Sequence, residues 1–225
     1  FLSSYKKENN YTVWLELATG LAQLEQILAK TKNREDVKKI VLNLFSPLAK
    51  SLGWNKKKKE LHTDTLLRSL LISRAGRSGN QEIIAETRKK FSAMQEGKHV
   101  SPDIRSAIYA IVATHGRMKE YKILVKKYKE ETLHEEKNRI GNALGDFADP
   151  KILKMVCKFA ISKNVRIQDT VGIISRVGMN PLGRDIWWNF VKKNWKMLMS
   201  RYGGGGFTLA RLVKAISDSA EDRHL

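Results

Sequence analysis

The residues closest to a known catalytic pattern are His134 and the four that follow it, HEEKN. A zinc peptidase needs His-Glu-x-x-His on a helix, because that spacing places two metal ligands one turn apart beside a glutamate base. Here the second ligand position is Asn138, so the motif predicts no zinc site. We assign the scattered remaining histidines to surface or helix-end positions: His62, His99, His115 and His224. We predict no metal, no cofactor and no catalytic residue in this chain.

Two further features could support chemistry. Cys157 is the only cysteine, which excludes an internal disulfide and a multi-cysteine zinc site and suits a reducing compartment. Its apolar neighbours predict a packed thiol. The glycine run at 203–206 precedes a helix starting at Phe207, but a phosphate-binding loop would need a preceding strand and a following Lys-Ser/Thr. A flexible connector is therefore the better interpretation.

The chain is strongly basic, with 42 Lys and Arg against 23 Asp and Glu, a net charge of +19. The charge is spread, since residues 1–112 carry 20 basic and 11 acidic side chains and residues 113–225 carry 22 and 12. The only dense run is Lys56–Lys59, which is either a solvated loop or a contact for nucleic acid or an acidic surface. No apolar stretch of 18 residues occurs, so we expect no membrane-spanning segment.

The elements that position these residues are predicted to be helices. Apolar residues recur at spacings of three and four, as in Trp14, Leu17 and Leu21, which is the amphipathic helix pattern. Ser101, Asp149 and Asn180 each precede a proline and are expected to cap a helix start. Trp187 and Trp195 share one apolar stripe and are expected in the core, whereas Trp188 lies off it. The predicted helices are 11–30, 34–51, 63–76, 81–96, 102–115, 117–130, 134–146, 150–162, 167–178, 181–201 and 207–218.

These helices repeat in pairs. Apolar positions recur every 31 residues, as in the sets Tyr109, Ile140, Val171 and Tyr128, Phe159, Phe190. Two short helices cannot bury their apolar face alone, so the pairs must stack. The sequence predicts an all-α fold of about eleven helices, an α-solenoid of stacked helix pairs of the HEAT/armadillo type, in one domain over 1–225.

Several segments, in order along nearly the whole chain, resemble the C-terminal helical domain of zinc aminopeptidases, which remove single residues from peptide N-termini. The segments that carry the resemblance include residues 10–14 (NYTVW), 45–47 (FSP), 52–54 (LGW), 103–106 (DIRS), 135–140 (EEKNRI) and 168–171 (QDTV).

The resemblance implies a fragment of a larger cytoplasmic metallopeptidase, without the last few helices of the domain. The one zinc ion and the catalytic residues belong to a separate catalytic domain upstream. This domain is then non-catalytic, and it closes the substrate chamber over the catalytic domain, its partner in the same chain. Peptides are the implied substrates.

Four arginines on successive first helices of the pairs are candidates for contacting a peptide carboxylate through charge-assisted hydrogen bonds: Arg68, Arg105, Arg139 and Arg176. The alternative is that they brace neighbouring helices. For the chain as a whole, the alternative function is a basic helical-repeat module that binds nucleic acid or docks proteins, because of its charge.

Overall fold

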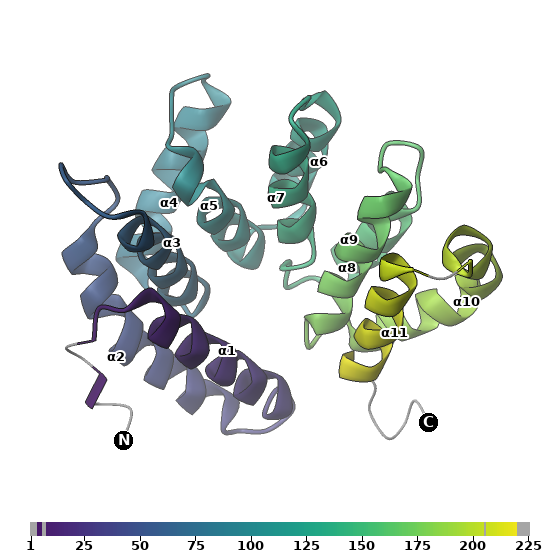
Figure 1. The fold of residues 1–225 in the computed structure, drawn as a ribbon, viewed down its shortest axis with the longest axis horizontal. Coiled ribbons are helices and arrows are strands. Elements are labelled where there is room, and N and C mark those ends of the chain that lie inside the picture. The colour runs from purple at the N-terminus through teal and green to yellow at the C-terminus, as the bar shows by residue number, and fades with distance from the viewer. Residues whose placement is uncertain (1–3, 6–7, 205, 220–225) are drawn as a thin grey trace. The chain divides into compact units, whose positions relative to one another are not determined.

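The structure is a computed structural model that describes residues 4–5, 8–204 and 206–219 (Figure 1). Over these residues it is all-helical, as predicted, with eleven α-helices and no strand. The helices are α1 (Tyr11–Ile27), α2 (Arg34–Leu52), α3 (His62–Arg77), α4 (Gln81–Gln95), α5 (Pro102–His115), α6 (Met118–Glu130), α7 (His134–Leu144), α8 (Pro150–Ala160), α9 (Ile167–Met179), α10 (Arg184–Tyr202) and α11 (Phe207–Ser219). Each predicted helix is present, with both ends within three residues of the prediction.

The predicted cap at Asp149 is present. The Asp149 carboxylate accepts a hydrogen bond from the Lys151 backbone N–H at 2.8 Å, and Pro150 begins α8. Gly53 ends α2 with φ +66°, a conformation that costs glycine little because it has no Cβ.

The predicted start of α10 was wrong by three residues. Residues 181–183 form a turn, and the helix begins at Arg184. The Asn180 side chain does accept from the Leu182 backbone N–H at 3.0 Å, but its Nδ2 donates to the carbonyls of Gly145 and Phe147, both at 2.9 Å. Asn180 therefore ties two loops together in addition to capping a turn.

The chain divides into two compact units, Phe1–Val112 and Ala113–Leu225. In the first unit α1 packs on α2 and α3, α2 packs on α3, and α3 packs on α4. Trp14 and Phe45 are fully buried and meet edge to face at 5.0 Å between ring centroids. The Trp14 indole Nε1 donates to the Glu8 carbonyl at 3.0 Å, so this large core residue leaves no polar atom unsatisfied.

In the second unit α9 lies among four neighbours. It contacts α7 and α11 as well as α8 and α10, and α8 also contacts α10 (Figure 1). The 31-residue repeat explains part of this packing, since Ile140 and Val171 are both buried at equivalent positions. Helices of successive predicted pairs thus contact one another inside this unit. A single solenoid through both units, and a single domain, stay predictions.

A close backbone approach joins α7 to α9. A Cβ atom on Gly145, the residue after α7, would lie 2.5 Å from Arg176 Cβ and 2.8 Å from the Arg176 carbonyl carbon. Gly141, one turn earlier, faces the Ile173 side chain, whose Cδ1 would lie 3.0 Å from an added Cβ atom. At Gly145 the approach to the α9 backbone is this close only because the position carries no side chain.

Candidate functional site

The near-motif at His134 lies at the start of α7. His134 is exposed, and Glu136 is buried and accepts a hydrogen bond from Arg139 Nη1 at 2.9 Å. Glu136 is therefore occupied in an ion pair. Among the described residues, no group of three or more His, Cys, Asp or Glu side chains could hold a metal ion. His224 lies outside the described residues.

Cys157 is a core residue of α8 with 1% exposure. Burial raises the pKa of its thiol to about 12, so the sulfur is protonated at neutral pH. A nucleophilic cysteine needs the thiolate, and this environment disfavours it.

The glycine run separates α10 from α11. Gly203 caps the C-terminus of α10, and Gly206, with φ +92°, precedes Phe207, the first residue of α11. Gly205 is outside the described residues. Two helices flank the run, so the strand of a phosphate-binding βα unit is not its neighbour here.

The expectation for the α10 tryptophans holds for one and fails for the other. Trp187 is fully buried, whereas Trp195 is 42% exposed. Trp195 and Trp188 instead line a shallow groove with Val191, and the ammonium group of Lys192 lies 5.7 Å from the Trp188 ring centroid. The apolar stripe of α10 is wider than the face that its neighbours cover, which spacing alone does not reveal.

Arg68 on α3 is the most buried of the four candidate arginines, with 1% exposure. Its Nε donates to the Gly53 carbonyl at 3.0 Å, and its Nη2 makes a short ion pair with the Glu60 carboxylate. The hydrogen bond from Arg68 holds the pKa of Glu60 below its usual value, with burial opposing this effect. Arg68 therefore joins both ends of the connection between α2 and α3.

The other three arginines also have partners close by. Arg139 on α7 pairs with Glu135 and Glu136 of its own helix. Arg176 on α9 lies 3.8 Å from Asp146, in the loop after α7, and Arg105 on α5 donates from Nε to the Val100 carbonyl at 3.0 Å. These contacts are of the bracing kind. Contact with a peptide stays a prediction.

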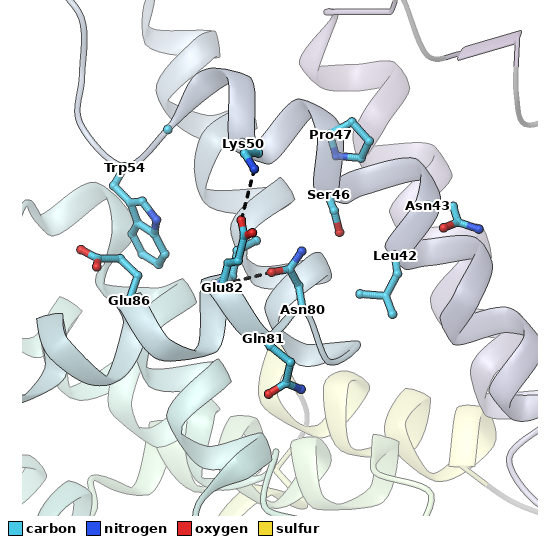
Figure 2. Close-up of a pocket in the computed structure, with 12 residues that line it drawn as sticks. Leu42, Asn43, Ser46, Pro47, Lys50, Trp54, Asn80, Gln81, Glu82 and Glu86 are labelled. Carbon is cyan, nitrogen blue, oxygen red and sulfur yellow. Dashed lines mark hydrogen bonds and ion pairs between the residues drawn. The ribbon is translucent and has the colours of Figure 1, made fainter.

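One cleft in the described part of the chain was not predicted from the sequence. It lies between α2 and the N-terminal part of α4, with a volume of about 920 Å³, and Figure 2 shows Trp54 at one end and Leu42 with Asn43 at the other. The Lys50 ammonium reaches across to the Glu82 carboxylate at 3.5 Å.

Proline inside α2 shapes one wall of this cleft. Pro47 has no N–H, so it cannot make the helical hydrogen bond to the Asn43 carbonyl. Ser46, beside it, has a buried hydroxyl with no hydrogen-bond partner in the described part of the chain. The only sequence signal for the cleft was a proline within a predicted helix.

Comparison with known proteins agrees with the resemblance read from the sequence. Aminopeptidase M1 of Arabidopsis thaliana is 30% identical over 222 residues, which cover 95% of this chain and 25% of that protein. Puromycin-sensitive aminopeptidase of Caenorhabditis elegans is 25% identical over 224 residues, 96% of this chain and 23% of the relative. Aminopeptidase N of Mus musculus is 28% identical over 150 residues, 65% and 16% respectively.

The chain thus spans about a quarter of the length of the first two of these relatives. The family model for the ERAP1-like C-terminal domain matches residues 1–224, and the chain therefore belongs to the ERAP1-like C-terminal domain family.

Proposed function

We propose that this chain is the non-catalytic C-terminal domain of a cytoplasmic zinc aminopeptidase that releases N-terminal residues from peptides. The observation that carries the proposal is the family match over residues 1–224, together with relatives that are named aminopeptidases. The zinc ion and the reacting groups lie in the catalytic domain of the same protein. Within the described residues, no helix is both long and apolar enough to cross a membrane.

The role of the domain is to close the substrate chamber over the catalytic domain. Stacked helix pairs suit this role, because they offer extended curved surfaces that border a separate site. Arg105, Arg139 and Arg176, each with part of its side chain exposed, are better placed than Arg68 to meet a peptide carboxylate. Arg68 would first have to release Glu60.

The test compares the longer protein with a version that lacks residues 1–225. We expect the complete protein to hydrolyse a short aminoacyl reporter and to discriminate against long peptides. Loss of this domain should weaken that discrimination more than it changes the reporter rate.

The purified 225-residue chain alone should hydrolyse neither substrate. Turnover by the clean chain, or one equivalent of tightly bound zinc, would contradict the non-catalytic assignment. Unchanged length discrimination without the domain would contradict the chamber role.

A second candidate function, nucleic-acid binding, is favoured by the net charge of +19. Phosphate neutralisation makes such binding fall steeply as salt rises. A gel-shift series with single-stranded RNA from low to physiological salt tests it, and binding that persists at physiological salt would favour this candidate.

A further inference from the structure

Four consecutive lysines stand on the connection between α2 and α3, residues 53–61, which we call the tetralysine loop. All four are exposed. The Lys57 ammonium donates to the Ser51 carbonyl at 3.2 Å, while Lys56, Lys58 and Lys59 have no acidic partner in the described part of the chain. Like charges held this close repel one another, so an anionic partner would be bound favourably.

The loop has a defined shape because a buried arginine closes it. Arg68 joins the Gly53 carbonyl to the Glu60 carboxylate, and Glu60 Oε2 also accepts from the Lys57 backbone N–H at 3.0 Å. A turn from Lys57 to Glu60 places Lys59 at φ +67°, which is unfavourable for a residue with a Cβ atom. A preset loop loses less conformational entropy on binding than a free one.

The cleft between α2 and α4 adjoins this loop, since Gly53 and Trp54 belong to both. Its apolar lining includes Leu42 and Ile83 in addition to Trp54, and the unpartnered Ser46 hydroxyl lies on its α2 wall (Figure 2). Such a cleft suits one apolar side chain.

The acidic residues of the cleft are already neutralised by lysines. Glu82 pairs with Lys50 at 3.5 Å, and Glu86 pairs with Lys90 at 3.4 Å and Lys89 at 3.8 Å. The surplus charge of the surface is therefore positive and lies on the loop. A partner that fits both parts carries carboxylates beside an apolar residue.

We propose that the tetralysine loop and the adjoining cleft form a docking surface for an acidic peptide segment with one apolar side chain. The carboxylates lie against the loop lysines, and the apolar side chain enters the cleft beside Trp54. Nucleic acid would engage the loop but would leave the apolar cleft without an occupant. The inference rests on the proposed function only in taking a peptide as the partner.

The experiment measures fluorescence anisotropy of a fluorescein-labelled heptapeptide, six glutamates around a central leucine, titrated with the purified chain at low salt. We expect saturable binding that weakens about threefold or more when glycine replaces the leucine. Removal of the loop charge should weaken binding about thirtyfold, equivalent to roughly 0.5 kcal/mol for each of four exposed ion pairs. This variant carries Lys56→Gln, Lys57→Gln, Lys58→Gln and Lys59→Gln.

A matched control removes the same charge from exposed lysines of α6 and α8 in the other unit. It carries Lys122→Gln, Lys129→Gln, Lys154→Gln and Lys158→Gln, and it should weaken binding by less than about threefold, since only long-range attraction changes. Circular dichroism melts check that both variants fold.

Equal weakening by the two variants would overturn the proposal, because binding would then follow net charge alone. So would equal affinity for the leucine and glycine peptides, or tighter binding of heptauridylate than of the leucine peptide. These measurements involve no turnover, so their failure would leave the proposed aminopeptidase role to its own test.

Discussion

Replacing Gly145 with alanine tests whether the close contact between α7 and α9 is required for the fold. Gly145 has φ −74° and ψ −8°, which alanine adopts freely, so any cost must come from contacts of the new methyl group. That carbon would lie 2.8 Å from the Arg176 carbonyl carbon and 3.0 Å from the Val177 nitrogen. Both are backbone atoms of a helix and cannot rotate away.

The expected loss follows from two opposing effects. Overpacking typically lowers the free energy of unfolding by about 1–3 kcal/mol. We expect a loss of about 3 kcal/mol here, because the neighbouring atoms belong to the backbone and cannot move aside. Alanine also stabilises the fold by roughly 0.5–1 kcal/mol, because it reduces the conformational entropy of the unfolded chain. The net loss of unfolding free energy is about 2 kcal/mol, and Tm should fall by roughly 4–8 °C for a chain of this size.

Thermal and urea unfolding followed by circular dichroism measure this loss. The matched control is Gly172→Ala on α9 itself, where the nearest atom to the new carbon, Arg211 Nη2, is 3.5 Å away, an ordinary contact. This control should raise stability by about 0.5–1 kcal/mol, because alanine favours the helix interior. An unchanged or raised Tm for Gly145→Ala would refute the packing of α7 against α9 described above.

Three further predictions concern buried polar groups. Burial raises the pKa of Tyr128 to about 12 from 10 in the unfolded chain, so stability should be lost as pH rises through 10 toward 12. The Tyr128 hydroxyl has no hydrogen bond among the described residues, so Tyr128→Phe should be neutral or stabilising by up to about 1 kcal/mol at pH 8. In urea titrations the variant should lose less stability at alkaline pH than the parent chain. A steeper alkaline loss would contradict the raised pKa of Tyr128. The pKa of Glu60 is lowered, so its contribution is present above about pH 4.5 and lost as pH falls through its folded pKa. Glu60→Gln should therefore lower the free energy of unfolding at pH 7 and make it depend less on pH below about 4.5. It should also speed amide hydrogen exchange in residues 53–61. Unchanged exchange would count against closure of the loop by Arg68. Cys157 should resist a disulfide reagent such as DTNB at pH 8 in the native chain and react fully in urea, so rapid native labelling would show that the thiol is accessible.

Most of the helix pattern could be predicted because its causes are local. Capping by Asp149 and the left-handed glycine at Gly53 involve residues within one or two turns. The start of α10 was missed because the Asn180 side chain also donates hydrogen bonds to backbone carbonyls more than thirty residues away. Trp195 was assigned to the core because periodicity identifies an apolar face but does not show how much of it another helix covers.

The candidate site was less accessible to sequence reasoning. The position of Arg68 on a first helix made it a candidate for peptide contact, and this contact stays a prediction. Its partners in the structure, Gly53 and Glu60, come from the preceding loop. The cleft beside Trp54 depends on the separation of α2 and α4, which no local pattern encodes.

The sequence by itself determined an all-α chain, the approximate limits of its helices and its family, because amphipathic spacing, capping residues and colinear segments are properties of neighbouring residues. Only the tertiary structure decided which helix contacts which, and therefore that Arg68 closes a loop, that Gly145 meets the backbone of α9 and that a cleft adjoins four lysines. These outcomes depend on distances between residues far apart in the chain, which are set by the packing of whole helices and not by local preference.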